Sequence, residues 1–156
     1  MNYELVKRLS DKKLEIATME SCTGGGLANY ITSVEGASKI LKFSAVTYSN
    51  EYKIKMGVSK ETIDEYSVYS IEVAREMSYN ILKFANADIG VGITGKINRE
   101  DMNNPGGKNN LVYASIYIKE KDIYYDEVIE LEGGNREANK EIIIQKIVEK
   151  LLEVMA

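Results

Sequence analysis

A short apolar run that stops abruptly at small polar residues and glycines constrains the fold of this chain more than any other feature. The run Ile16–Met19 is followed by Glu20-Ser21-Cys22-Thr23 and then by three glycines, Gly24 to Gly26. Apolar residues at helical spacing resume at Leu27. This order predicts a strand, a tight turn and a helix start, which places backbone N–H groups outside the carboxyl end of the strand. We therefore expect a ligand site at this junction.

Hydrophobic periodicity along the chain predicts alternating helices and strands. We expect helices over residues 2–10, 27–34 and 70–86 and after Asn135, short helical pieces on either side of Gly57, and strands over 14–18, 43–48, 89–94, 111–119 and 123–131. Helical crossovers join parallel strands, whereas the last two strands form an antiparallel hairpin. The pattern indicates an α/β fold: one three-layer α/β/α domain over residues 1–156, with a mixed, largely parallel sheet.

The composition excludes several classes of chemistry. The 156 residues include no histidine and a single cysteine, Cys22, which excludes an internal disulfide, a His/Cys zinc site and any Ser–His or Cys–His pair. The net charge of −4 and the pI near 5.1 argue against nucleic-acid or membrane partners. The start of the chain has no signal-like segment, and no apolar run approaches the ~20 residues that span a bilayer. We expect a cytoplasmic protein without metal or cofactor.

Polar residues cluster where three predicted strands end. The clusters are Glu20–Thr23, Tyr48–Lys53 and Thr94-Gly95. The carboxyl ends of strands in an open α/β sheet share one rim, so segments that are distant in sequence meet there. This convergence favours a functional site on that rim.

Each of these residues also has a structural explanation. Ser21 and Thr23 fit helix N-caps, the glycines fit a tight turn, and Lys53 fits a surface lysine. Arg136 is different, because a cation at the start of a helix opposes the helix dipole. Taken singly, none of the residues favours catalysis over structure.

Five blocks in sequence order resemble the CinA C-terminal domain family. They are Glu20-Ser21-Cys22-Thr23-Gly24-Gly25, Tyr48-Ser49-Asn50-Glu51-Tyr52-Lys53, Val68-Tyr69-Ser70, Gly92-Ile93-Thr94-Gly95 and Gly134-Asn135-Arg136. Known members are nicotinamide-nucleotide amidohydrolases, which convert nicotinamide mononucleotide to nicotinate mononucleotide and ammonia. The resemblance runs from about Leu14 to the C-terminus and implies a small-molecule nucleotide substrate.

The resemblance also implies residue roles. By motif, Ser21 is the nucleophile and Lys53 the base that takes its proton, while Tyr48 and Thr94 position or polarise groups in the pocket. A lysine base has to be neutral, which burial or a neighbouring cation favours. The glycine-rich helix start supplies N–H donors either to the oxyanion or to the phosphate. The remaining expected binding residues are Thr23, Gly24, Gly25, Asn50, Gly95, Lys140 and, for the phosphate, Arg136.

One segment departs from the family pattern. Family members run from Thr-Gly into a short Ala-Gly-Pro stretch, whereas this chain has Lys96–Asn110, in which only Pro105-Gly106-Gly107 is similar. A loop of this length is more often functional than filler, and we expect it to line the pocket. The alternative function is therefore a nucleotide-binding homologue with altered or lost turnover, and a third is a structural or interaction domain.

Family members tend to associate, so we expect a homo-oligomer, with a dimer favoured. The candidate interface is the tyrosine-rich hairpin, which carries Tyr113, Tyr117, Tyr124 and Tyr125.

Overall fold

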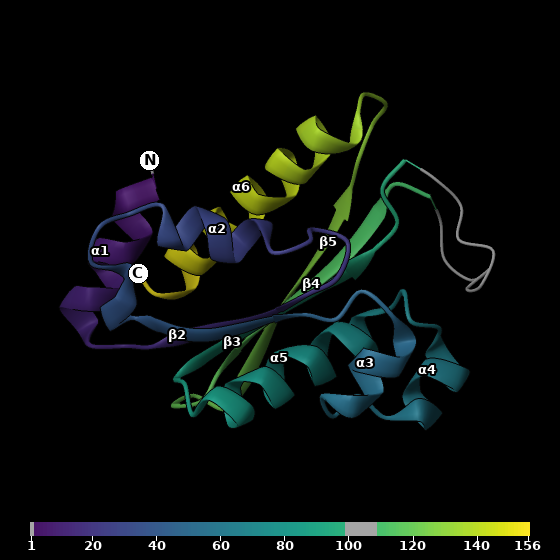
Figure 1. Cartoon of the computed structure of the whole chain (residues 1–156), viewed down its shortest axis with the longest axis horizontal. Helices are drawn as coiled ribbons and strands as arrows, with labels where there is room; N and C mark the ends of the chain where they lie inside the picture. Colours follow the sequence, from purple (N-terminus) through teal and green to yellow (C-terminus); the bar gives the residue numbers. More distant parts are fainter. Residues whose placement is uncertain (1, 99–108) are drawn as a thin grey trace.

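The computed structural model describes residues 2–98 and 109–156. Its elements are α1 (Asn2–Lys12), β1 (Ile16–Glu20), α2 (Gly26–Thr32), the 3-10 helix η1 (Ala37–Lys39), β2 (Leu41–Val46), α3 (Asn50–Lys55), α4 (Lys60–Tyr66), α5 (Ile71–Ala85), β3 (Ile89–Gly95), β4 (Leu111–Ile118), β5 (Ile123–Glu130) and α6 (Arg136–Val154). Helices α1, α2 and α6 cover one face of the sheet, and α3, α4 and α5 cover the other (Figure 1). The three-layer α/β/α prediction is confirmed.

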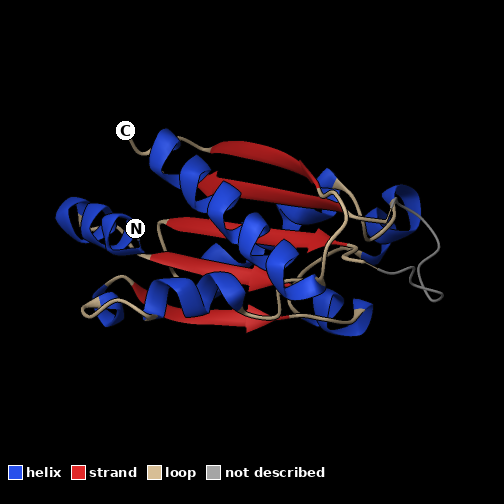
Figure 2. Cartoon of the chain, turned by 90° about the horizontal axis from the view of Figure 1, so that it is seen from above, coloured by secondary structure: helices blue, strands red, loops and turns tan. Residues whose placement is uncertain are grey.

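The described strands form one sheet in the order β2-β1-β3-β4-β5. Strand β1 pairs in parallel with both β2 and β3, whereas β4 pairs antiparallel with β3 and with β5. Strand β4 is therefore the one described strand that runs against the others. The prediction of a mixed sheet is confirmed. Apart from β4, the described strands all run in the same direction, but the two pairings that β4 makes, with β3 and with β5, are antiparallel. Figure 2 shows α6 lying across this sheet at an angle to the strands.

The first two strands are shifted by two residues from the periodicity-based prediction, and two of their limits have a clear cause. Strand β2 ends at Val46, two residues earlier than expected, because Ser49 is already the N-cap of α3 and accepts a hydrogen bond from the backbone N–H of Tyr52. Strand β1 begins only at Ile16 because Leu14 still belongs to the end of α1: the backbone N–H of Leu14 donates to Leu9 O at 2.9 Å. Capping interactions at the neighbouring helices set both limits.

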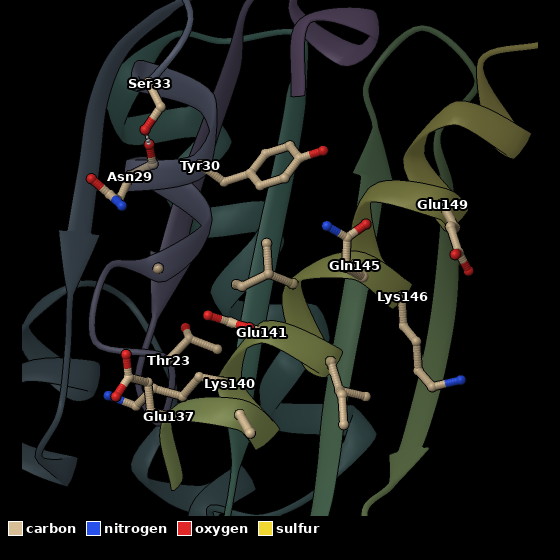
Figure 3. A pocket seen from close by; sticks show the side chains of 14 residues that line it. Thr23, Asn29, Tyr30, Ser33, Glu137, Lys140, Glu141, Gln145, Lys146 and Glu149 are labelled. Atoms are coloured by element: carbon tan, nitrogen blue, oxygen red, sulfur yellow. Dashed lines mark hydrogen bonds between the residues drawn. The ribbon is translucent and has the colours of Figure 1, made fainter. Parts of the chain in front are cut away.

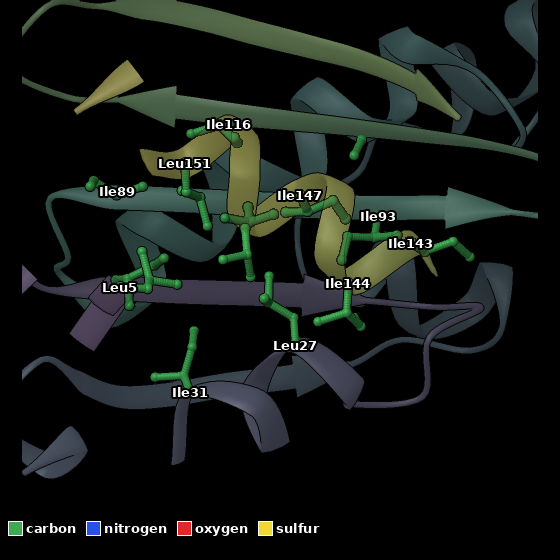
Figure 4. Packing of buried hydrophobic residues seen from close by; sticks show 14 of the residues in the cluster. Leu5, Leu27, Ile31, Ile89, Ile93, Ile116, Ile143, Ile144, Ile147 and Leu151 are labelled. Atoms are coloured by element: carbon green, nitrogen blue, oxygen red, sulfur yellow. The ribbon is translucent and has the colours of Figure 1, made fainter. Parts of the chain in front are cut away.

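The sheet separates two hydrophobic cores. On one face, α6 packs Ile143, Ile147 and Leu151 against the sheet, and Leu27 of α2 and Leu5 of α1 complete the layer (Figure 4). On the other face, the buried side of α5 packs against β1 through Met77, Ile81, Ala17 and Met19. No described helix is long and apolar enough to cross a membrane.

The tyrosine-rich hairpin contributes partly to the second core. Tyr117 is buried, and its ring packs against Tyr79 of α5 and Tyr124 of β5 with centroids 5.2 and 4.7 Å away. Its hydroxyl donates to Asp122 Oδ1 at 2.6 Å. The interface prediction is therefore wrong for Tyr117, because this side chain already packs within the chain. The predicted oligomer itself stays a prediction.

Glycines in β3 let α5 lie directly on the sheet. A Cβ at Gly92 would overlap the carbonyl oxygen of Ala74 and lie 2.7 Å from Ser78 N. A Cβ at Gly90 would overlap Ser78 O. These contacts are with helix backbone, which cannot move aside as a flexible side chain can. The close approach fixes α5, and with it the segment before its N-cap Ser70, next to the end of β3.

Gly92→Ala is predicted to destabilise the protein because the new methyl group overlaps the α5 backbone. We expect the free energy of unfolding to fall by about 1–3 kcal/mol or more, measured by urea denaturation. Gly133→Ala is the matched control, since a Cβ there meets nothing within 4 Å. Equal stability of the two variants would show that α5 is not held at this distance.

Candidate active site

Ser21 and Lys53 lie side by side at the carboxyl end of the central strands. Lys53 Nζ is 2.9 Å from Ser21 Oγ and 2.7 Å from the carbonyl oxygen of Thr47, to which it donates. Lys53 is 2% exposed and Ser21 8% exposed. Lys53 is thus not the surface lysine that its charged neighbours suggest, and it has the burial that a base role requires. The two residues are within direct proton-transfer reach.

Backbone pairing at the sheet rim brings these two residues together. Ser21 N donates to Ile93 O of β3 at 3.1 Å, and Thr47 N donates to Glu20 O at 2.8 Å. The ends of β2, β1 and β3 are therefore locked together, as the shared-rim argument predicts. Helix α3 begins two residues after Tyr48 and points Lys53 back to this rim.

Cys22, directly after Ser21, is not a competing nucleophile. Its thiol is buried, and burial raises its pKa to about 12 against the opposing influence of the nearby Lys53 ammonium. The thiolate is the reactive form, so the group stays protonated and unreactive near neutral pH. The hydroxyl of Ser21 is the nucleophile candidate that the geometry leaves.

Glu20 organises the turn that carries Ser21. Its buried carboxylate accepts hydrogen bonds from the backbone N–H of Leu27 and of Ala28, both at 2.9 Å, and from the Thr23 and Thr18 hydroxyls at 2.6 and 3.0 Å. The carboxylate thus takes the first-turn donors of α2, and the interpretation of Ser21 and Thr23 as N-caps is wrong. The sequence signal for this role is an acidic residue that ends an apolar strand directly before a helix start.

The turn leaves several backbone donors beside the Ser21 hydroxyl. In the described part of the chain, nothing accepts a hydrogen bond from the backbone N–H of Thr23 or Gly25. Gly24 and Gly25 have φ values of 60° and 94°, and this left-handed backbone is open to glycine and costly for other residues. The turn therefore has backbone donors available, whereas the first-turn donors of α2 already bind Glu20.

Of three further expected pocket residues, Thr94 and Gly95 play structural parts in this conformation. Thr94 is fully buried, and its hydroxyl donates to Val68 O at 3.0 Å instead of facing Ser21. A Cβ at Gly95 would lie 2.6 Å from Val112 Cα, so this glycine serves the packing of β3 on β4. Asn50 is half-buried in the first turn of α3, one helical turn before Lys53.

Tyr48 and Arg136 form an outer layer of the site. Tyr48 is exposed, and its hydroxyl accepts a long hydrogen bond of 3.5 Å from Arg136, whose guanidinium also donates to Ile97 O. Arg136 thus ties the start of α6 to the segment after β3, which explains a cation at a helix N-terminus. Lys140, one turn later, approaches the glycine turn: a Cβ at Gly24 would lie 3.6 Å from its Nζ.

An asparagine network, unnoticed in the sequence, anchors the segment after β3. Asn98 N donates to Asn110 Oδ1 at 2.7 Å, Asn98 Nδ2 donates to Gly134 O at 2.5 Å, and Asn139 Nδ2 donates to Asn98 Oδ1 at 2.6 Å. Asn98 has φ 57°, a conformation that asparagine adopts more readily than most residues. Residues 99–108, which include Pro105-Gly106-Gly107 and most of the predicted pocket loop, lie outside the described residues.

A groove of about 880 Å³ runs between α2 and α6 (Figure 3). Thr23 and Lys140 line it, together with Tyr30 and Gln145, but Ser21 and Lys53 do not. The groove lies on the α2/α6 face of the sheet, whereas Lys53 belongs to α3 on the other face (Figure 1). It is therefore a neighbour of the site and not the site itself.

Two further observations bear on the chemistry of the rim. Thr47 Oγ1 is buried without a hydrogen-bond partner among the described residues, beside the carbonyl that holds Lys53. No described group of histidine, cysteine and carboxylate side chains has the geometry of a metal site. The arrangement is a hydroxyl–amine pair with adjacent backbone donors.

Glu20→Gln is predicted to destabilise the α2 junction. The amide NH₂ would face backbone or hydroxyl donors, and each buried donor left unsatisfied costs about 1–3 kcal/mol. Urea denaturation should show that loss for Glu20→Gln and a change below about 0.5 kcal/mol for Glu51→Gln, whose exposed carboxylate pairs with Lys55. Equal values for the two variants would contradict the capping role of Glu20.

Sequence comparisons find relatives that are named competence-damage inducible proteins. A competence-damage inducible protein of Thermoanaerobacter pseudethanolicus is 44% identical over 122 residues, which cover 78% of this chain and 29% of that protein. A homologue of the same name from Thermoanaerobacter sp. is 49% identical over 96 residues, covering 61% of this chain and 23% of that protein. The chain spans less than a third of the length of these relatives.

Solved structures show the same fold. A CinA superfamily protein from Escherichia coli has a TM-score of 0.89 at 29% identity, covering 98% of this chain and 87% of that one. A competence or damage-inducible protein from Enterobacter asburiae has a TM-score of 0.91 at 25% identity, covering 99% and 96% of the two chains. Residues 1–155 match the CinA C-terminal domain. The chain belongs to the CinA C-terminal domain family.

Proposed function

We propose that this chain is an amidohydrolase that deamidates nicotinamide mononucleotide to nicotinate mononucleotide and ammonia, with Ser21 as nucleophile and Lys53 as general base. One observation carries the proposal: the 2.9 Å separation of Lys53 Nζ and Ser21 Oγ, both buried, at the sheet rim. The substrate identity rests on the family resemblance of the sequence blocks around these two residues.

Acylation uses the two contacts of Lys53. As a neutral amine, Lys53 accepts the Ser21 hydroxyl proton while one of its N–H groups remains bonded to Thr47 O, which keeps the nitrogen lone pair directed at Oγ. Ser21 Oγ attacks the carboxamide carbon, and the carbonyl π electrons move to oxygen. When the tetrahedral intermediate collapses, the C–N bond breaks, Lys53 returns the proton to nitrogen, and ammonia leaves.

Backbone N–H groups of the glycine turn stabilise the developing oxyanion. An amide is a poor electrophile, so donors have to be in place before the negative charge appears. The N–H groups of Thr23 and Gly25 have no partner in the described structure and lie in the turn that follows Ser21. The Glu20 contacts hold this turn rigid.

Deacylation reverses the roles with water. The acyl group is an ester of Ser21, and water gives its proton to Lys53 as it attacks the carbonyl carbon. Collapse of the second tetrahedral intermediate breaks the bond to Oγ, and the Ser21 hydroxyl is restored with the proton from Lys53. The products are a pyridine carboxylic acid and free enzyme.

Ser21→Ala and Lys53→Met should each abolish most ammonia release from nicotinamide mononucleotide. Loss of a general base typically lowers the rate about 10²- to 10⁴-fold, and loss of the nucleophile should cost at least as much. Lys55→Met is the matched control, because it removes an exposed lysine from the same helix. A coupled ammonia assay, with folding verified by circular dichroism, measures the effect.

Hydroxylamine distinguishes the acyl-enzyme route from direct hydrolysis. A Ser21 ester would be intercepted to give the hydroxamate of the nucleotide, which mass spectrometry detects. Unchanged ammonia release by Ser21→Ala would refute the mechanism. No release by the wild-type chain at high enzyme concentration, together with nucleotide binding, would instead favour a binding homologue without turnover.

A further inference from the structure

Lys96 is a nearly buried cation whose position the reaction above does not use. It follows β3 directly, it is 6% exposed, and its Nζ lies 5.0 Å from the ring centroid of Tyr69. No described residue forms an ion pair or hydrogen bond with its ammonium group. A buried charge is costly unless it is paired, and a contact with a ring face offsets only part of that cost. Lys96 therefore has an unmet requirement for an anion.

The strand period places Lys96 on the same face of the sheet as Lys53. Along β3, Gly90 and Gly92 face the backbone of α5, and Thr94 donates to Val68 O just before that helix. Side chains two residues apart share a face, so Lys96 continues this series and meets Tyr69 there. Helix α3, which carries Lys53, covers the same face (Figure 1).

The place of Lys96 along the chain suits a group at the far end of a nucleotide. Ser21 N is bonded to Ile93 O, and the backbone of Lys96 lies three residues further along, about 10 Å from that of Ile93 at the rise of a strand. A mononucleotide with a reactive carboxamide places its phosphate a pyridine ring and a ribose away from the amide. A cation immediately next to Ser21 would be too close to reach this phosphate.

The start of α2, one of the anion sites that the sequence suggested, is already occupied within the chain. The first-turn donors of α2, the N–H groups of Leu27 and Ala28, bind the Glu20 carboxylate. A phosphate placed there would compete with a buried negative charge. The unpaired donors of the turn before α2 are thus left for the oxyanion, and the start of α2 is not available to the phosphate.

We propose that Lys96, held over Tyr69, binds the phosphate monoester of the substrate and so selects nucleotides over nucleosides at this site. The position of the amide in this inference rests on the proposed function, whereas the binding of a phosphate by Lys96 does not. The proposal makes Lys96 a specificity-determining residue without a part in bond breaking.

Lys96→Met tests this assignment with little change in side-chain length. In a Ser21→Ala background, which stops turnover, calorimetry should show nicotinamide mononucleotide binding about 10- to 100-fold more weakly after Lys96→Met, the effect of losing one charge-assisted hydrogen bond. Nicotinamide riboside, which lacks the phosphate, should change by less than about twofold. Lys119→Met, which removes an exposed charge beyond the opposite end of β4, should affect neither ligand.

Inorganic phosphate provides a probe that does not depend on the amide. At millimolar concentration it should raise the thermal midpoint of the wild-type chain above that in chloride of equal ionic strength, and Lys96→Met should remove this difference. Equal weakening of both ligands, unchanged binding of both, or no phosphate effect in the wild type would each overturn the proposal. Phosphate-dependent binding without ammonia release would leave Lys96 assigned and refute the amidohydrolase reaction alone.

Discussion

The buried carboxylate of Glu20 is the group around which the β1–α2 junction is built. A fully buried charge has to be hydrogen-bonded, and the first N–H groups of a helix need acceptors. The Glu20 carboxylate at the end of β1 and the first N–H groups of α2 meet both requirements by bonding to each other. The chain reverses sharply between them through Gly24 and Gly25 in left-handed backbone. Because side chains alternate along a strand, Ser21 emerges on the face opposite Glu20, where α3 supplies Lys53. One ionic anchor therefore positions both Ser21 and the backbone donors that follow it.

Most of the fold follows from sequence periodicity, but the burial of individual polar groups does not. The strands, the hairpin and the α6 stripe were predictable because each presents a regular apolar face to the sheet. The strand ends predicted the rim, and the motif predicted the Ser21–Lys53 pair. The burial of Lys53 was not predictable from its charged local sequence, since it depends on a carbonyl of another segment, Thr47. The hydrogen bond of Thr94 was not predictable either, because its hydroxyl partner, Val68 O, belongs to a turn that only tertiary packing brings near.

Two lysines on the same face of the sheet are suited to different tasks by their surroundings. Lys53 has oxygen atoms of Ser21 and Thr47 at hydrogen-bond distance, which orient its nitrogen toward a hydroxyl proton. Lys96 has an aromatic face, which tolerates its charge without fixing a hydrogen-bond direction. The Lys96 ammonium is available to an incoming anion, whereas Lys53 already has hydrogen bonds with its neighbours. Charge alone would not separate these roles; their partners do.

The segment after β3 shows how one site can combine fixed chemistry with a variable surrounding. Arg136 and Asn139 of α6 hold Ile97 and Asn98, and Asn110 on the other side of residues 99–108 is bonded to Asn98 as well. Both ends of that stretch are thus fixed to the same scaffold. Lys96 lies just before this anchor, and Ser21 is joined to β3 through Ile93. The hydrogen bonds of Lys53 with Ser21 and with Thr47 involve no residue between 99 and 108, so a departure from the family pattern at this place is compatible with an intact hydroxyl–amine pair.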